Sequence, residues 1–292
     1  MRYTRLAMLR APLFVALLAY FAPACATPEP TAPLSVWAFE LEARAAAATP
    51  ALPEPSATAQ CAPVDPLDVL FIGNSYVMQS DTPGLLDAMA RDAGIDFRVE
   101  RLASGGKNFE FHLGRRQTKA KLSERSWDVV VLQSHSLDPL RNPEGFAAAG
   151  TKLVEAVRES GAQPWLFETW ARREGHNLYG YMNATVGTTP AEMQSRVTAR
   201  YEALGEATGT PVAKVGTAWL QLVQQNPDIR PHLKDGAHPA EAGAYLSAAV
   251  VFTHLTERDP RGVLQPHGAV DAEAAKVLQQ IAFDVVSPPC TW

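Results

Sequence analysis

The chain has 292 residues, of which 47% are hydrophobic and 20% are charged, a composition typical of a soluble globular protein. Its formal net charge is -5 and its isoelectric point is about 5.8. This balance, with no polybasic run along the chain, argues against nucleic acid or an anionic membrane surface as the main partner.

The first 26 residues have the pattern of an export signal. Three arginines within the first ten residues precede the apolar stretch APLFVALLAYFA, and small residues suited to cleavage follow it. The apolar stretch is shorter than the roughly 20 residues of a membrane-spanning helix. Two alternatives stay open: cleavage after Ala26, or a lipid anchor on Cys25, although Pro23 stands where a lipid-attachment motif usually has a small residue. We expect an exported protein, whether periplasmic, secreted or an outer-membrane lipoprotein that meets the membrane only through Cys25.

Residues 27–66 are rich in proline and alanine. Such a segment buries too little apolar surface to order itself, so we expect a tether between the signal, residues 1–26, and a folded domain at residues 67–292. Cys61 and Cys290 lie near the two ends of that domain. In an exported protein we expect them to form a disulfide, and two free thiols are the alternative.

From residue 67 onward, short apolar runs alternate with amphipathic segments. The apolar runs predict strands at 68–73, 97–103, 127–133, 163–170 and 210–216. The amphipathic segments predict helices at 82–94, 108–125, 143–161, 190–209 and 238–258. In the last of these helices, Pro239 would occupy the first turn. Strands separated by helices of this length indicate a mostly parallel sheet, and uninterrupted apolar strands are typical of a sheet covered on both faces. We therefore predict an α/β fold, a three-layer α/β/α sandwich around a doubly wound sheet of five strands.

Small or polar residues follow the ends of the first three predicted strands. Ser75 follows the first strand, Gly105 and Gly106 follow the second, and Gln133 follows the third. Ligands of doubly wound sheets bind beyond the carboxyl ends of the strands. We therefore expect these residues to converge on one edge of the sheet.

A serine nucleophile at that edge needs a base within hydrogen-bond reach and a carboxylate that orients the base. Among the seven histidines, only His238 has a carboxylate, Asp235, three residues before it. Both lie in a loop that enters the last predicted helix, so the loop can come close to Ser75.

The motifs FIGNSY, ASGGKN and DGAHP, taken in this order and spacing, resemble the blocks of the SGNH (GDSL-type) hydrolase superfamily over most of the folded part. The resemblance implies the flavodoxin-like fold of that superfamily. It also implies that Ser75 is the nucleophile, that His238 is the general base and that Asp235 orients it. Gly106, or less favourably Gly105, would offer a backbone N–H to the oxyanion.

Two positions depart from the family pattern. Asn74 stands where the first block usually has Asp, and LQSHS replaces the third block, whose Asn completes the oxyanion hole. Gln133 carries the same amide one methylene further out. A bacterial branch that resembles this chain in VVLQ and in the HP…G.YL.A ending favours Gln133 as the third donor, beside the backbone N–H groups of Ser75 and Gly106.

The resemblance implies a serine esterase that acts on short acyl esters, with acetyl esters and carbohydrates as candidates, and that needs no cofactor and no metal. Asn74, Trp170 and Arg172 are candidate substrate contacts, since aromatic and Arg groups at the carboxyl edge suit a sugar or a carboxylate. One alternative is a non-catalytic envelope binding protein on the same fold. Another is a metal-dependent hydrolase that uses the run His232, Asp235 and His238 as ligands.

Overall fold

The computed structural model describes residues 65–264 and 266–287. The export signal, Cys25, Cys61 and Cys290 lie outside the described residues, so their expected roles stay predictions. No helix in the described part of the chain is long and apolar enough to cross a membrane.

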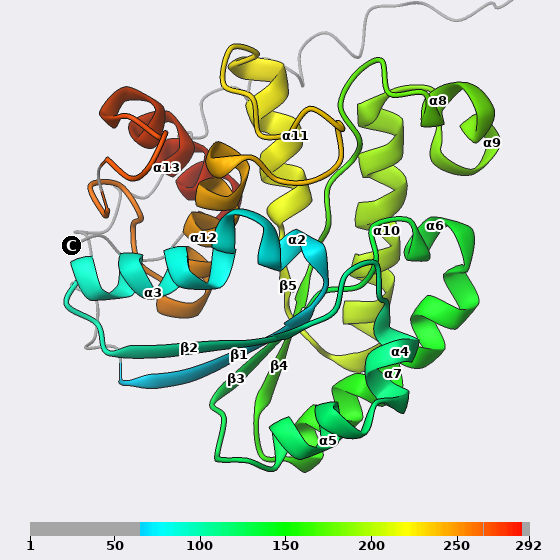
Figure 1. Cartoon of the computed structure of the whole chain (residues 1–292), viewed down its shortest axis with the longest axis vertical. Helices are drawn as coiled ribbons and strands as arrows, with labels where there is room; N and C mark the ends of the chain where they lie inside the picture. Colours follow the sequence, from blue (N-terminus) through cyan, green and yellow to red (C-terminus); the bar gives the residue numbers. More distant parts are fainter. Residues whose placement is uncertain (1–64, 265, 288–292) are drawn as a thin grey trace, which may run out of the picture. The chain divides into compact units, whose positions relative to one another are not determined.

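A five-stranded sheet lies at the centre of the described residues (Figure 1). Its strands are β1 (Leu67–Gly73), β2 (Phe97–Ala103), β3 (Val129–Leu132), β4 (Gln163–Phe167) and β5 (Val212–Ala213). They are hydrogen bonded in the order β2-β1-β3-β4-β5, and every neighbouring pair is parallel. This order is that of a flavodoxin-like, doubly wound sheet, so the predicted fold class is confirmed. The direction of winding changes between β1 and β3, and ligands of such folds bind at this switch point.

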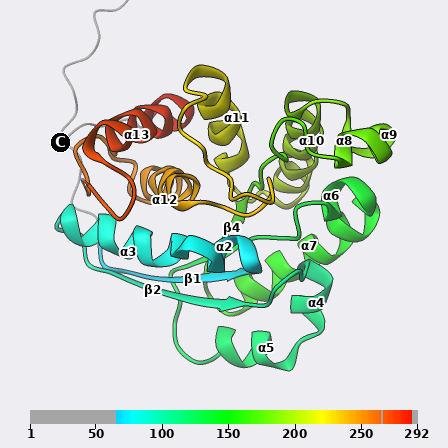
Figure 2. The ribbon, with the colours of Figure 1, turned by 45° about the horizontal axis from the view of Figure 1, so that its top comes forward.

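Helices cover both faces of the sheet (Figure 2). One face is covered by α3 (Thr82–Asp92), α11 (Val215–Gln225), α12 (Glu241–Thr256) and α13 (Ala272–Val286). The other face is covered by α4 (Phe109–Gly114), α5 (Arg116–Leu122), α7 (Pro143–Glu159) and α10 (Pro190–Thr208). Shorter helices lie in the connections: α2 (Ser75–Met78), η1 (Gln79–Asp81), α6 (Asp138–Arg141), α8 (Leu178–Tyr181) and α9 (Asn183–Val186).

The strand β1 is buried on both faces. Val69 and Phe71 pack in the hydrophobic cluster of α3, α12 and α13, whereas Leu70 and Ile72 pack in the cluster of α7 and α10. Because successive strand residues point to opposite faces, an uninterrupted apolar run is what a sheet between two helical layers requires. The rigid end of β1 is therefore a fixed point from which the next residues are presented.

Two predicted helices have wrong boundaries. The helix predicted at 108–125 is divided into α4 and α5, because Arg115 between them has an extended backbone with φ -86° and ψ 122°. The last predicted helix begins at Glu241 rather than at 238. Pro239 therefore lies before the first turn of this helix, where it pairs with His232 in an antiparallel bridge.

The strand and helix content near the carboxyl end of the sheet also differs from the prediction. The fourth strand ends at Phe167 rather than at 170, and the fifth is confined to Val212–Ala213 because α11 begins at Val215. The helices α11 and α13 were not predicted. The shortened fourth strand leaves residues 168–177 free to form a long connection above the edge of the sheet.

Candidate active site

The nucleophile candidate Ser75 is the first residue of α2 and lies two residues beyond Gly73, where β1 ends. Asn74 between them is the N-cap of α2, where its side chain accepts a hydrogen bond from the N–H of Tyr76 at 3.0 Å. The other end of the Asn74 amide donates to the carbonyl of Lys107 at 2.8 Å. The turn that carries Ser75 is thereby tied to the loop after β2.

Gln133 holds the same turn from the other side. Its side chain is fully buried, and its Oε1 accepts a hydrogen bond from the backbone N–H of Asn74 at 2.9 Å. Its Nε2 donates to the carbonyl of Ser134. A side chain at Gly73 would place a Cβ only 2.6 Å from Oε1, so glycine is needed for this close approach. Gln133 thus fixes the position of the nucleophile turn, and its buried amide bonds the backbone of Asn74 and Ser134.

The structure brings Ser75, His238 and Asp235 together in one row. The Ser75 Oγ lies 2.9 Å from His238 Nε2, although 163 residues separate the two in sequence. The opposite ring nitrogen, Nδ1 of His238, lies 2.5 Å from Oδ2 of Asp235. With the Nδ1 proton donated to the carboxylate, Nε2 is left as the acceptor for the serine hydroxyl.

Asp235 is held in its charged form. Partial burial raises its pKa, but the hydrogen bonds from the His238 ring and from the backbone N–H groups of Ala237 and His238 outweigh that effect and lower the pKa to about 2. The carboxylate is therefore ionised at neutral pH and can orient the imidazole. The Asp235 and His238 side chains are 48% and 34% exposed, so water and substrate have access to them.

A narrow hairpin carries this acid–base pair. We call residues 231–240 the base loop. Its two arms are joined by hydrogen bonds from the Leu233 N–H to the His238 carbonyl and from the Ala240 N–H to the Pro231 carbonyl, both at 2.8 Å. These bonds leave the imidazole of His238 little freedom to leave its position above α2.

An aromatic stack joins the base loop to the nucleophile turn. The Trp170 ring lies parallel to Tyr76 at 4.4 Å on one face and to Trp219 at 3.8 Å on the other. The Trp170 indole N–H donates to the Ala237 carbonyl of the base loop at 2.9 Å. The Tyr76 ring also meets the His238 ring edge-on, with centroids 5.4 Å apart. Trp170 is only 1% exposed, and its contacts tie the base loop to the nucleophile turn.

The loop after β2 offers a backbone N–H beside the nucleophile turn. The Lys107 N–H donates to the Ser104 carbonyl at 3.2 Å, which closes a turn with Gly105 and Gly106 at its centre. Gly106 has φ +68°, in the left-handed region that favours glycine. Within the described part of the chain, neither the N–H of Ser75 nor that of Gly106 has a hydrogen-bond partner. Both are available as oxyanion donors.

Comparisons with solved structures agree with this fold. No family model matches the chain, and no curated protein matches it. Among solved structures, a protein from Slackia heliotrinireducens assigned to the SGNH hydrolases is 27% identical, with a TM-score of 0.54 over 64% of this chain and 98% of that one. The chain therefore shares the fold of the SGNH hydrolases, the superfamily that its sequence motifs resemble.

Two further solved structures share this fold. A DUF4886 family protein from Bacteroides uniformis is 20% identical and has a TM-score of 0.66 over 77% of this chain and 96% of that one. The acetyl xylan esterase AlAXEase is 14% identical and has a TM-score of 0.52 over 64% of this chain and 99% of that one.

The run His232, Asp235 and His238 does not form a ligand set in the structure. The described residues contain no group of three or more His, Cys, Asp or Glu side chains that could hold a metal ion. His232 instead directs its Nε2 to the carbonyl of Ala171 at 2.9 Å, and its ring lies edge-on against Trp219. Burial is the main cause of the lowered pKa of His232, about 4, so its ring is neutral at pH 7.

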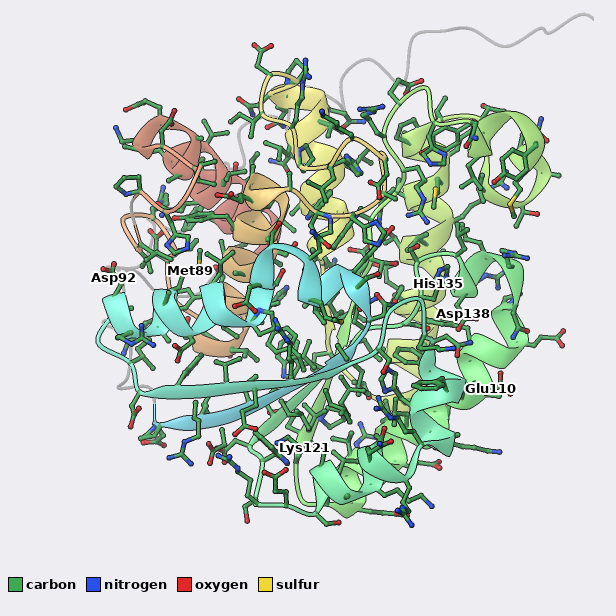
Figure 3. All side chains as sticks on the ribbon, in the orientation of Figure 1. Met89, Asp92, Glu110, Lys121, His135 and Asp138 are labelled. Atoms are coloured by element: carbon green, nitrogen blue, oxygen red, sulfur yellow. The ribbon has the colours of Figure 1, made fainter. Side chains whose placement is uncertain are left out.

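Sequence reasoning missed two residues that support the candidate site. His112 is fully buried, and its Nε2 lies 2.8 Å from the carbonyl of Gly73, directly before the nucleophile turn. Asp138 accepts hydrogen bonds from Ser134 at 3.0 Å and from Asn108 at 3.1 Å. It thereby joins the loop after β3 to the loop after β2. Figure 3 labels Asp138 at the start of α6, near His135. Neither residue belongs to a motif of recognisable spacing, so no sequence signal singles them out.

Proposed function

We propose that this protein is an exported serine esterase that removes short acyl groups, acetyl groups on carbohydrates among them. The observation that carries the proposal is the 2.9 Å contact between Ser75 Oγ and His238 Nε2, with Asp235 bound to the opposite ring nitrogen. This row of three groups is the arrangement that converts a serine hydroxyl into a nucleophile.

In the first half of the reaction, Ser75 Oγ attacks the ester carbonyl carbon while His238 Nε2 takes the hydroxyl proton. The backbone N–H groups of Ser75 and Gly106 stabilise the negative charge on the carbonyl oxygen. His238 then gives the proton to the alcohol oxygen, the carbon–oxygen bond breaks, and the acyl group stays on Ser75.

In the second half, water takes the place of the alcohol. His238 accepts a proton from the water, whose oxygen attacks the acyl carbon, and the same N–H groups stabilise the second oxyanion. Collapse of this intermediate releases the carboxylic acid and returns the proton to Ser75. Asp235, charged because its pKa is about 2, stabilises the imidazolium in both halves.

Two observations support a short acyl group on a carbohydrate as the substrate. The acetyl xylan esterase AlAXEase shares the fold and shows that this scaffold accommodates removal of a short acyl group from a carbohydrate. The exposed positions of His238 and Asp235 suit an ester on a polar, solvated alcohol.

The test compares purified wild type and Ser75→Ala on p-nitrophenyl acetate and on p-nitrophenyl decanoate, each with and without chelator. We expect the acetate to be hydrolysed faster, the rate to fall about 10⁴-fold or more in Ser75→Ala, and chelator to have no effect. Preference for the decanoate would contradict the short-acyl assignment.

A binding protein on the same fold is the second candidate, and one observation favours it: Gln133 is fully buried, and its amide bonds the backbone of Asn74 and Ser134. A site with two oxyanion donors rather than three loses about 10²–10³ in rate. Equal rates in wild type and Ser75→Ala would identify this second candidate.

A further inference from the structure

A deep pocket lies beside the catalytic groups without including them. Its volume is about 800 Å³, and its walls are the connection 170–174, the start of α10, one side of α11 and residues 227–232. The helices α10 and α11 lie side by side in Figures 1 and 2, and the pocket opens between them. A pocket of this size accommodates a molecule of one or two rings.

The walls are apolar with a positive rim. Apolar contact comes from Pro190, Leu220, Val223 and Ile229 among others. The charged side chains of the wall are Arg172, Arg173, Arg230 and Glu174, three positive charges and one negative. Among the described residues, none of these arginines forms an ion pair with a carboxylate.

Arg172 is the deepest of these charges. It is 8% exposed, and its guanidinium donates to two neutral hydroxyls, that of Tyr76 and, at 2.9 Å, that of Ser136. A buried charge without a counter-charge is costly, and an anion entering the pocket would lower that cost. The positive field reaches further along the wall: burial first, and then the charges of Arg172 and Arg173, lower the pKa of His232 to about 4.

The pocket shares a wall with the catalytic site. The Arg173 N–H donates to the Gly236 carbonyl of the base loop at 2.9 Å, and the Trp170 indole donates to the next carbonyl, that of Ala237. On the other side, Arg172 contacts Tyr76, the residue after the nucleophile. Residues of this wall therefore contact both the base loop and the nucleophile turn.

We propose that this pocket is the subsite for the alcohol half of the ester, and that it selects an alcohol bearing a carboxylate on an apolar ring. The inference rests on the proposed esterase function. Apolar walls take the ring, while arginine, whose planar guanidinium matches a carboxylate in two hydrogen bonds, takes the charge.

The experiment uses pairs of acetyl esters that differ only in charge: 3- and 4-acetoxybenzoate, each beside its methyl ester. For each pair we measure kcat/KM for both compounds and divide the value for the carboxylate by the value for the methyl ester. We expect a ratio of about ten or more for at least one isomer in the wild type. The ratio should fall as salt is added, because the recognition is electrostatic.

Arg173→Gln and Arg230→Gln test the source of the selectivity, since both side chains are exposed and their removal leaves the buried contacts of Arg172 intact. Each should lower the ratio several-fold, and the double variant about tenfold. Arg200→Gln is the matched control, because Arg200 is exposed on α10 outside the pocket wall and changes the net charge equally. A wild-type ratio near one, or an equal fall of the ratio in Arg200→Gln, overturns the proposal.

Failure of the esterase function gives a different result. If the protein hydrolyses none of the four esters, calorimetric titration of 4-acetoxybenzoate and its methyl ester replaces the rates. If the wild type binds the carboxylate more tightly than the methyl ester, and the Arg173/Arg230 double variant does not, the subsite proposal is supported and the esterase proposal is rejected. Equal binding of the two compounds, or none, rejects the subsite.

Discussion

The nucleophile turn and the base loop place their catalytic groups by different means. Around Ser75, Asn74 is 2% exposed and Gln133 is fully buried, and both bond the turn to neighbouring strands and loops at the edge of the sheet. The base loop is open to solvent at Asp235 and His238. It is held by a few bonds to the connection after β4 and by edge-on ring contacts of His232 with Trp219 and of His238 with Tyr76.

Because of this difference, substitutions in the two regions should differ in how strongly they affect protein stability and the position of the catalytic groups. The nucleophile turn is continuous with the buried core, so a change there also removes buried hydrogen bonds, each costing about 1–3 kcal/mol when a partner is left unsatisfied. The base loop contributes less buried surface, so a change in its few anchors should move His238 at a smaller cost in stability. Measurements of rate and of unfolding on variants of each region can therefore distinguish a loss of stability from a displacement of His238.

The largest decreases in rate should come from substitutions of the two catalytic side chains in the base loop. His238→Ala removes the proton acceptor and should lower kcat/KM for p-nitrophenyl acetate about 10⁴-fold or more, whereas Asp235→Asn should lower it roughly tenfold less. Because both side chains are partly exposed, the midpoint of urea unfolding should change little in either variant. A larger loss in Asp235→Asn than in His238→Ala would contradict the assigned roles.

The nucleophile edge can be tested at the two glycines of the loop after β2. Gly106 has φ +68°, so Gly106→Ala strains the turn by about 1–2 kcal/mol and shifts the oxyanion donor. We expect kcat to fall about 10²-fold, as for loss of one donor.

Gly105→Ala is the matched control for this substitution. No atom lies within 4 Å of the added Cβ at either position, and only Gly106 has a positive φ. Kinetics and urea unfolding should therefore show near wild-type values for Gly105→Ala. An equal loss of kcat in both variants would remove the special role of Gly106.

A smaller decrease in kcat should follow from removing one of the hydrogen bonds that hold the base loop. Trp170→Phe keeps an aromatic ring in the stack but removes the hydrogen bond to the Ala237 carbonyl. We expect kcat for p-nitrophenyl acetate to fall several-fold and the free energy of unfolding to fall by about 1 kcal/mol.

Trp219→Phe provides the comparison, because it removes an indole hydrogen bond from the same stack that goes instead to the Ser247 hydroxyl at 3.0 Å. Its cost in stability should be similar, about 1 kcal/mol, with kcat unchanged. If both variants lower kcat equally, the stack acts as a packing element and the bond to Ala237 has no positioning role.

The two regions also differ in what the sequence could predict. The nucleophile turn is local: an uninterrupted apolar strand followed by Gly73, Asn74 and Ser75 fixes both the element and its end. The sheet and its coverage on both faces followed from the same pattern. The interaction that ties Gln133 to Asn74 joins β3 to β1, and no spacing in the chain reveals it.

The base loop was identified by its motif, but its conformation was not predicted. The sequence pattern placed Pro239 inside a helix, where proline is favoured in the first turn. The bridge between His232 and Pro239 competes with that preference and delays the helix to Glu241. The anchors from residues 170–173 are non-local contacts, made possible by the early end of β4 at Phe167, and local propensity carries no information on them.

The pH dependence of stability should sharpen the comparison through a histidine of the base loop. Burial lowers the pKa of His232 to about 4 from an ordinary value of 6.5, so folding favours the neutral ring. Its contribution is fully present above pH 6.5 and is lost as the pH falls toward 4, because the unfolded chain binds the proton more readily. Urea unfolding between about pH 7 and about pH 4 should therefore show a smaller decline in His232→Gln than in the wild type, by about 3 kcal/mol. Gln can still donate to the Ala171 carbonyl, and His267→Gln, at an exposed position, is the control. An unchanged decline in His232→Gln would mean that acid acts on the fold through other histidines, such as His254 and His112, whose pKa values burial also lowers.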